Sequence, residues 1–135
     1  MNVSKHISIN EATNSPTALR LKISNDPNTE QLNAMCLVAE MCFEPLREWY
    51  GKPIKVNSFF RSDALNKAVG GSKTSQHCKG EAIDLTGGSK EENEKIFNWC
   101  KENLMFDQLI NEYDFSWIHV SYKKEGNRNQ ILVIK

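Results

Sequence analysis

The sequence predicts an α+β fold in which helices pack on an antiparallel sheet. Helical spacing of apolar residues dominates the first half of the chain, and its longest run covers residues 28–50. Alternation of apolar and polar residues dominates the second half, most clearly at 82–85 and 117–122. This order, with helices early and antiparallel strands later, favours an α+β fold over a parallel α/β sheet.

The size and charge of the chain limit the classes of function. A chain of 135 residues is expected to form one domain, residues 1–135, with a substantial core. Charged residues make up 25% and apolar residues 39%, as is ordinary for a soluble globular protein. Seventeen basic and seventeen acidic residues cancel, so no overall field favours nucleic acid or a membrane surface as a partner. We therefore expect neither as a partner. We also expect a monomer.

No targeting segment or disulfide pattern is visible. The chain has no apolar run of the roughly 18–20 residues that a membrane helix needs, and its first residues lack the apolar segment of a secretory signal. We expect synthesis in the cytosol without an export route of its own. The four cysteines form no CxxC pair, which favours reduced, mostly buried thiols over disulfides. They are Cys36, Cys42, Cys78 and Cys100.

The N-terminal part is expected to be an arm followed by the main helix. Residues 3–23 form the arm, which packs against the domain and holds a helical turn starting at Pro16. The main helix follows, with Asn28 as its cap, Gln31 as the reciprocal partner and a kink or interruption near Pro45. Its apolar stripe indicates core packing rather than a cofactor site. The stripe comprises Leu32, Met35, Cys36, Ala39, Cys42, Phe43, Leu46 and Trp49.

The middle of the chain is expected to form a strand, a short helix and a loop. The strand covers 54–60 and ends at Arg61, and the helix is capped by Ser62 and stopped by the glycine pair at 70–71. The polar loop that follows leads directly into His77. A mobile loop at that place suits a rim that admits substrate.

The C-terminal part is expected to supply a helix and the rest of the sheet. Ser89 and Glu92 match a capping box, and the buried stripe of the helix comprises Ile96, Phe97, Cys100 and Leu104. A strand, a turn around residues 114–116 and a second strand follow between residues 106 and 122. After a turn at 123–130, the last residues close the sheet as a final strand.

Two strands each carry one metal-binding side chain on a single face. In the alternating run 82–85, Asp84 shares a face with Ala82, and in the run 117–122, His119 shares a face with Trp117 and Ser121. His77 can reach the same side from the preceding loop. Two imidazoles and one carboxylate around an open position form a ligand set found in catalytic zinc sites.

The surroundings of these residues make a metal site plausible on physical grounds. A carboxylate such as Asp84 in an apolar strand needs a partner, because burial of a bare charge is costly. The alternative to a metal is a salt bridge to Arg61 or to a lysine. His119 lies between two apolar residues and is likewise a polar side chain in an apolar strand.

The spacing of these residues resembles that of the M15 peptidases. The pattern runs Ser75-x-His77-x-x-Gly80-x-Ala82-x-Asp84 and is followed by Trp117-x-His119. M15 peptidases include zinc D-alanyl-D-alanine carboxypeptidases and phage endolysins, and they share a fold with the hedgehog signalling domain. Further stretches resemble the small M15 subfamily of phages and bacteria, so that the likeness covers nearly the whole chain. These stretches are PLRE, KPIKVNSFFRS, LNKAVGGSKTSQH, FDQLINE and WIHVSY.

The resemblance implies a hedgehog/DD-peptidase-like fold, a zinc ion and its ligands, which are His77, Asp84 and His119. Zinc peptidases also need a carboxylate that takes a proton from water and passes it to the leaving amine. Many M15 members have an acid three residues before the last histidine, but Ser116 occupies that position here.

Glu112 is our candidate for the catalytic base, because it matches the acid of the subfamily's DQLI-x-E stretch. Asp114 is the rival. The alternative for Glu112 is a solvated acid at a strand end.

Three further residues are expected to contact substrate. By resemblance, Arg61 lies in the active site, where it binds a substrate carboxylate or stabilises the oxyanion. Its alternative role is structural pairing with an acid, either Asp84 or Glu112. Ser75 and Gln76 are expected to line the site, with Ser75 as a hydrogen-bonding group beside the ligands. Cys78 is omitted because side chains of adjacent residues rarely converge on one ion, and His6 receives no role.

The resulting hypothesis is a zinc-dependent peptidase that hydrolyses amide bonds in peptidoglycan stem peptides. The bond is either that between terminal D-alanines or that between L-alanine and D-glutamate. The alternative is a zinc-stabilised, non-catalytic binding module of the hedgehog-like fold that recognises a cell-wall peptide or a protein partner. A phage lysis protein released to the cell wall and a bacterial housekeeping enzyme both fit. The sequence leaves the bond, the source, the oligomeric state and the metal preference open.

Overall fold

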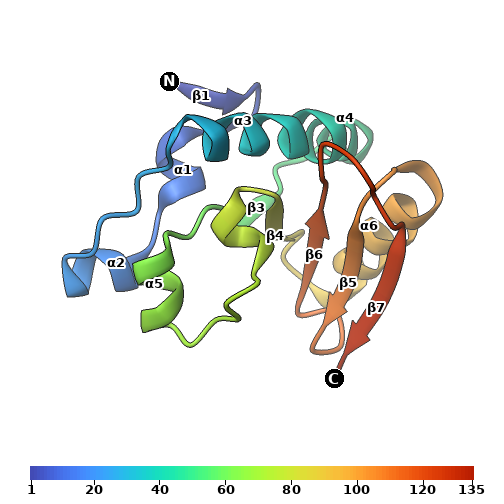
Figure 1. Ribbon diagram of the computed structural model, residues 1–135. Coiled ribbons are helices and arrows are strands. Elements are labelled where there is room, and N and C mark those ends of the chain that lie inside the picture. Colours follow the sequence, from blue (N-terminus) through green and yellow to red (C-terminus); the bar gives the residue numbers. More distant parts are fainter.

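The computed structural model describes all 135 residues and shows a mixed α+β architecture, as predicted (Figure 1). The N-terminal half contains β1 (Asn2–Ser4), β2 (Ile7–Ser8), α1 (Ile9–Thr13), α2 (Pro16–Leu21), α3 (Thr29–Val38), the π-helical segment η1 (Ala39–Phe43) and α4 (Glu44–Tyr50). The rest contains β3 (Lys55–Ser58), α5 (Asp63–Ala68), the 3₁₀ turn η2 (Gln76–Lys79), β4 (Ala82–Thr86), α6 (Lys90–Asn103), β5 (Gln108–Glu112), β6 (Trp117–Ser121) and β7 (Gln130–Ile134). None of these helices combines the length and the apolar character needed to cross a membrane.

The main sheet has the strand order β3-β4-β6-β5-β7, and its first four strands pair antiparallel, as predicted. The last strand differs, because β7 runs parallel to β5. The reason is steric: β4 and β5 already occupy both edges of β6. The chain leaving β6 therefore reverses direction and takes the free edge of β5.

The sheet separates an apolar core from a polar face. Ile83 and Leu85 on β4 and Ile118 and Val120 on β6 are at most 1% exposed and belong to the core cluster. Residues of α3, η1, α4 and α6 complete this cluster, and Figure 1 shows α6 lying against one side of the sheet. The alternate residues of β4 and β6 therefore face the other side, where the candidate site lies.

The long helix begins as predicted and is interrupted near its proline. Asn28 and Gln31 form the expected capping box at the start of α3. Pro45 has no N–H to donate to the preceding turn. Just before it the helix widens into η1, where the Glu44 N–H donates to the Ala39 carbonyl. The predicted interruption thus takes the form of a π-helical turn.

The N-terminal arm packs on the domain, as predicted. Val3 and Ile7 are buried in the core, and Ala18 is buried in the predicted helix at Pro16. The arm is also tied to α4 through Glu44, which accepts a hydrogen bond from the Ser4 hydroxyl (2.5 Å) and lies 2.6 Å from the Nδ1 atom of His6. His6, which received no role from the sequence, therefore contributes to holding the arm.

Three local predictions were wrong in detail. The strand predicted at 54–60 ends at Ser58, because Phe60 donates instead to Ala12 of the arm. Trp49 is 46% exposed and stacks on Trp99 at the surface instead of joining the core. Only half of the capping box at α6 forms: Ser89 accepts the Glu92 N–H, but the Glu92 carboxylate accepts from Tyr50 and Lys52.

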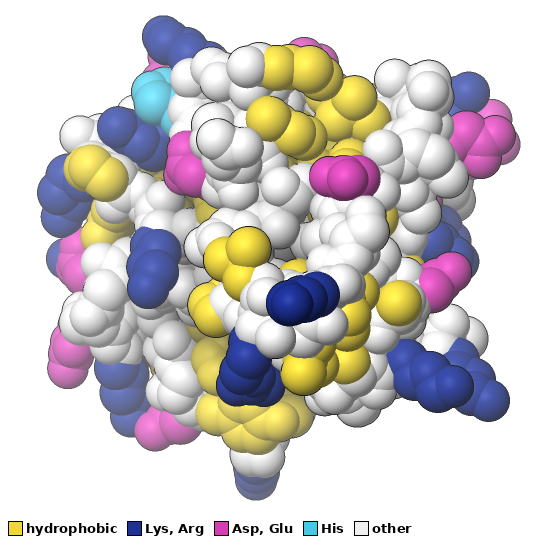
Figure 2. Space-filling model, turned by 90° about the vertical axis from the view of Figure 1, so that its left-hand side faces the viewer, with side chains coloured by type: hydrophobic (Ala, Val, Ile, Leu, Met, Phe, Trp, Pro, Cys, Tyr) yellow, Lys and Arg dark blue, Asp and Glu magenta, His cyan; other side chains and the backbone are white.

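The cysteines and the surface agree with expectation. All four cysteines are free, Cys42 and Cys100 are buried, and burial raises the pKa of the Cys42 thiol to about 12. On the face drawn in Figure 2, basic and acidic side chains are interspersed and neither sign dominates, consistent with the net charge of zero.

Truncation of a side chain on the central strand β6 should destabilise the fold more than truncation on the edge strand β7. Ile118 is fully buried on β6, so Ile118→Ala should lower the free energy of unfolding by about 2–5 kcal/mol through lost burial and a cavity. Ile131 on β7 is 41% exposed, and the matched Ile131→Ala change should cost less than about 1 kcal/mol. Urea denaturation measures both. Equal losses would contradict the placement of the core.

Candidate metal centre

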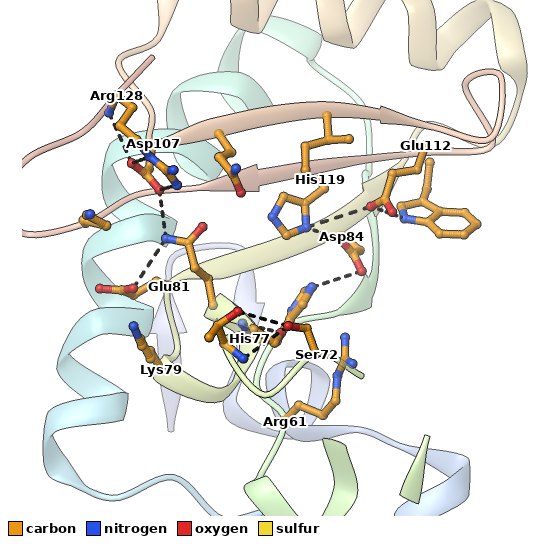
Figure 3. A pocket seen from close by; sticks show the side chains of 17 residues that line it. Arg61, Ser72, His77, Lys79, Glu81, Asp84, Asp107, Glu112, His119 and Arg128 are labelled. Atoms are coloured by element: carbon orange, nitrogen blue, oxygen red, sulfur yellow. Dashed lines mark hydrogen bonds and ion pairs between the residues drawn. The ribbon is translucent and has the colours of Figure 1, made fainter. Parts of the chain in front are cut away.

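A polar cleft opens on the face of the sheet opposite the core (Figure 3). Its volume is about 670 Å³, and only 2 of its 17 lining residues are hydrophobic, so it suits a polar ligand. Strands β4, β5 and β6 contribute lining residues, and the loop and turn at 72–79 supply more. The loop predicted to form a rim thus lies at the cleft.

His77, Asp84 and His119 come together in this cleft. Asp84 on β4 pairs in register with His119 on β6, which places both side chains on the same face. The Nδ1 atom of His119 lies 2.9 Å from Asp84 Oδ1, and the Nε2 atom of His77 lies 3.2 Å from Asp84 Oδ2. One potential ligand atom from each residue lies within 4.8 Å of the others. The geometry is that of a group able to hold one metal ion.

The His77 ring is oriented by the backbone around it. Its Nδ1 atom lies 2.8 Å from the carbonyl oxygen of Phe59, which can only accept, so Nδ1 donates there and Nε2 is the ring atom that faces the cluster. Such a hydrogen bond to the outer nitrogen is the usual support of a metal-binding histidine. Phe59 is available for this contact because β3 ends one residue earlier, at Ser58.

The turn that carries His77 is fixed at both ends. Ser75 caps η2 by accepting the His77 N–H, and the Arg61 N–H donates to the His77 carbonyl. Gly80 ends the turn with φ +74°, and a Cβ there would lie 2.5 Å from the carbonyl oxygen of Gln31 on α3. A glycine is therefore required for the turn to approach the helix this closely.

Asp84 is paired by histidines and by none of the cations considered from the sequence. Its side chain is 13% exposed, and its ion-pair partners are His77 and His119; neither Arg61 nor a lysine contacts it. Burial acts to raise the pKa of Asp84, but hydrogen bonds from the two histidines outweigh it and hold the pKa well below its usual range. Asp84 is therefore an ionised carboxylate placed between two imidazole nitrogens.

Glu112 lies beside this cluster with the opposite electrostatic character. Its Oε2 atom is 3.9 Å from His119 Nδ1 and accepts a 3.0 Å hydrogen bond from the Trp117 indole. Burial raises the pKa of Glu112, and the negative charge of Asp84 raises it further, against the smaller effects of His119 and Trp117. With 16% of its side chain exposed, Glu112 is not a solvated strand-end acid.

The rival acid points elsewhere. Asp114 is 74% exposed, pairs with Lys90 Nζ at 2.7 Å and does not line the cleft. Ser116 donates its hydroxyl proton to the Tyr113 carbonyl. Of the acids weighed for the role of base, only Glu112 faces the cluster.

The turn between Glu112 and Trp117 has an unusual backbone. Its residues Tyr113, Asp114 and Phe115 all have φ between 52° and 60°, a left-handed conformation that is costly for non-glycine residues. Buried Asn93 on α6 stabilises this turn by donating to the carbonyls of Phe115 (2.8 Å) and Ser116 (3.2 Å). The helix thus helps to fix the hairpin that carries Glu112 and its indole partner.

The remaining sequence candidates also line the cleft. Arg61 donates to Asn66 Oδ1 at 3.0 Å and makes no ion pair with Asp84 or Glu112, so the alternative structural role does not form. Ser75 lines the cleft while it caps η2. Gln76 lines it as well and donates to Asp107 Oδ2 at 3.1 Å.

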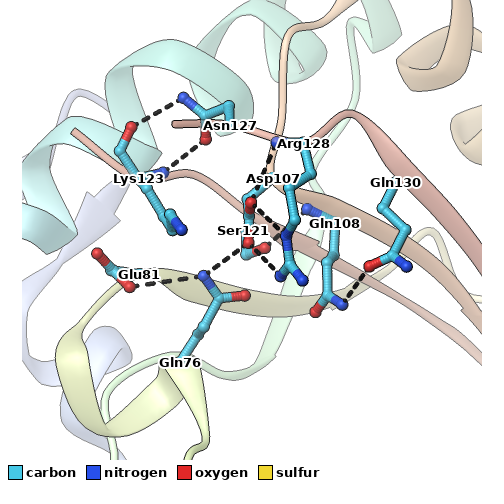
Figure 4. Close-up of polar contacts among 9 residues, drawn as sticks. All are labelled: Gln76, Glu81, Asp107, Gln108, Ser121, Lys123, Asn127, Arg128 and Gln130. Atoms are coloured by element: carbon cyan, nitrogen blue, oxygen red, sulfur yellow. Dashed lines mark hydrogen bonds and ion pairs between the residues drawn. The ribbon is translucent and has the colours of Figure 1, made fainter. Parts of the chain in front are cut away.

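An ion pair between Arg128 and the buried acid Asp107 closes one end of the cleft and was not predicted from the sequence (Figure 4). Asp107 is fully buried, and Arg128 donates to both of its carboxylate oxygens, from Nε at 3.0 Å and from Nη2 at 2.8 Å. Asp107 begins the DQLI-x-E stretch and directly precedes a strand, but neither feature indicates a partner. Its partner lies 21 residues later in a segment that reads as a plain turn.

Comparison with known proteins identifies the family. Residues 5–121 match the family model described as Peptidase M15, which is most of the chain. No curated protein matches the chain.

The ion pair of Arg128 with Asp107 is expected to make the stability of the protein depend on pH. Asp107→Asn should lower the free energy of unfolding at pH 7 by roughly 1–3 kcal/mol, because the hydrogen bonds from half-exposed Arg128 lose their charged acceptor. Hydrogen bonds from Arg128 lower the pKa of Asp107, against the effect of burial. The stabilisation is therefore complete above the unfolded-state pKa of about 3.9 and is lost as the pH falls through the lower folded-state value.

Urea denaturation from pH 7 down to pH 2 checks this expectation. The difference between wild type and Asp107→Asn should shrink below about pH 4. Glu125 is exposed and unpaired, so Glu125→Gln should differ little from wild type at any of these pH values. A difference for Asp107→Asn that stays constant with pH would show that the charge of Asp107 contributes nothing.

Proposed function

The chain belongs to the M15 peptidase family, and on that premise we propose that it is a zinc-dependent peptidase acting on peptidoglycan stem peptides. The observation that carries the proposal is the convergence of His77, Asp84 and His119 within 4.8 Å, with Glu112 beside them in an open polar cleft. No serine or cysteine nucleophile is needed, because the attacking group is water.

The donor set fits zinc. Two imidazole nitrogens and one carboxylate oxygen match catalytic zinc sites that keep one position open. His77 would bind through Nε2, because its Nδ1 is engaged by Phe59, and His119 would bind through Nδ1, the atom that faces Asp84. A zinc ion held there would act as a Lewis acid and lower the pKa of a water molecule.

Glu112 is suited to move the proton. The Trp117 indole occupies its Oε2 atom and leaves Oε1 free to take a proton from the attacking water and to pass it to the leaving amine. A raised pKa improves this function, since a base that is too acidic holds the proton too weakly to deliver it. Glu112 thus acts as base and then as acid.

Arg61 is suited to bind a negative charge on the substrate. One guanidinium nitrogen of Arg61 donates to Asn66, and the guanidinium forms no ion pair with a carboxylate of the chain. The rest of its planar fork can therefore bind the terminal carboxylate of a peptide or stabilise the oxyanion of the tetrahedral intermediate. Ser75 and Gln76 line the same cleft and contribute polar contacts.

The polar lining of the cleft supports a stem peptide as the substrate. Four of the lining residues are basic and four are acidic, which suits a peptide that carries several carboxylates and amides. Both the D-Ala–D-Ala bond and the L-Ala–D-Glu bond fit this description. Either a phage lysis protein or a bacterial wall enzyme would cleave such a peptide.

The test is cleavage of purified peptidoglycan in the presence and absence of zinc, followed by detection of new amino groups. Wild type should release peptides only with metal, and Glu112→Gln should reduce the rate by about 10²–10⁴-fold, since it removes general acid–base catalysis. Asp114→Asn is the matched control and should retain activity, because Asp114 lies outside the cleft.

Two results would contradict the proposal. Activity that persists in Glu112→Gln but is lost in Asp114→Asn would reverse the assignment of the base. Zinc-dependent binding of peptidoglycan without any cleavage by wild type would instead support the non-catalytic binding module.

A further inference from the structure

One end of the cleft is built around the ion pair of Arg128 with Asp107. Asp107 is fully buried and is held by its own backbone, whose N–H donates to the Ser121 carbonyl at 2.8 Å. Its carboxylate accepts from the Arg128 side chain at 3.0 and 2.8 Å and from Gln76 at 3.1 Å. A buried acid thus fixes the direction of a basic side chain at the cleft wall.

Arg128 keeps part of its hydrogen-bonding capacity free. Its side chain is 52% exposed and lines the cleft, and its Nη1 atom has no partner in the chain. Lys123 also lines this end, and its positive charge contributes to the low pKa of Asp107. The site therefore offers an oriented guanidinium and a nearby ammonium group to an incoming anion.

Gln76 supplies a second sign of an incomplete site. Its amide nitrogen donates to Asp107, but its Oε1 atom is buried and has no hydrogen-bond partner. A buried acceptor without a partner costs about 1–3 kcal/mol, so its presence at a cleft needs an explanation. This unpaired acceptor beside Arg128 therefore marks an end of the cleft whose hydrogen bonding a ligand would complete.

The strand register gives the distance between this end and the metal ligands. Ile110 on β5 pairs with His119, so Asp107 lies three residues along the strand from the level of His119. At about 3.4 Å per residue the separation is roughly 10 Å. An extended peptide with its scissile bond at His119 would present the second or third residue from that bond to Arg128.

We propose that the Arg128 end of the cleft binds a side-chain carboxylate on the second residue from the scissile bond of the peptide. This inference rests on the proposed peptidase function and adds a determinant of its specificity. In a stem peptide of the order L-Ala, D-Glu, diamino acid, D-Ala, D-Ala, the third residue is the second from either candidate bond. This residue lies on the N-terminal side of the D-Ala–D-Ala bond and on the C-terminal side of the L-Ala–D-Glu bond. Because a bound peptide has one direction, the third residue reaches the Arg128 end for one of the two bonds, and a diaminopimelate carboxylate is the group that fits.

Two synthetic pentapeptides test the proposal. They carry meso-diaminopimelate at the third position, with its side-chain carboxylate either free or amidated. Wild type with zinc should cleave the carboxylate form with a kcat/KM about 10- to 100-fold higher, as expected for charge-assisted hydrogen bonds. Arg128→Gln should lose this preference mainly through KM, whereas Arg128→Lys, which retains charge without the fork, should keep part of it.

Controls separate this inference from folding and from the proposed function. Arg20→Gln removes an exposed, unpaired arginine on α2 and should keep the full preference. Thermal unfolding and zinc titration show whether Arg128→Gln remains folded and binds metal. Calorimetric binding of both peptides to wild type and to Arg128→Gln reads the preference without cleavage, so it tests Arg128 even if wild type hydrolyses neither.

Two results would overturn the inference while leaving the proposed function intact. One is equal cleavage and equal binding of the two pentapeptides by wild type. The other is a preference that persists undiminished in folded Arg128→Gln, which would make the ion pair with Asp107 purely structural.

Discussion

The site depends on the pairing of the Asp84 carboxylate with the imidazoles of His77 and His119. This carboxylate is held largely out of water. Such a charge is tolerated only with close partners, and both partners depend on distant parts of the chain. The pairing of β4 with β6 places His119 opposite it. The turn η2 supplies His77, and Gly80 allows this turn to approach α3 closely. The Phe59 carbonyl then orients the His77 ring.

The pKa values of Asp84 and Glu112 are shifted in opposite directions by their surroundings. Hydrogen bonds from His77 and His119 hold the pKa of Asp84 low, whereas burial and the charge of Asp84 raise the pKa of Glu112. Asp84 is thereby kept ionised and Glu112 is suited to carry a proton, a division of roles that proton-transfer catalysis uses. The left-handed turn stabilised by Asn93 keeps the second acid beside the first.

The sequence predicted those features that depend on local patterns. Helical spacing gave α6 and the long helix, and strand alternation placed Asp84 and His119 each on the polar face of its strand. Their convergence was inferred because two isolated polar residues in apolar strands each needed a partner. Features that depend on long-range pairing carried no such signal: the parallel direction of β7, the contact of His77 with a backbone carbonyl, and the Asp107–Arg128 pair. Every residue has a carbonyl, and an arginine in a polar turn is ordinary.

A crystal structure of the protein with zinc, phased by anomalous scattering at the zinc edge, would show whether His77, Asp84 and His119 bind one ion. We expect one zinc ion within about 2.0–2.2 Å of His77 Nε2, an Asp84 oxygen and His119 Nδ1, with the fourth position open to solvent beside Glu112. An anomalous map without a peak at this cluster, or with zinc bound only by other residues, would contradict this expectation. Asp84 would then be a structural acid paired by two histidines, and the hydrolytic role would lose its basis.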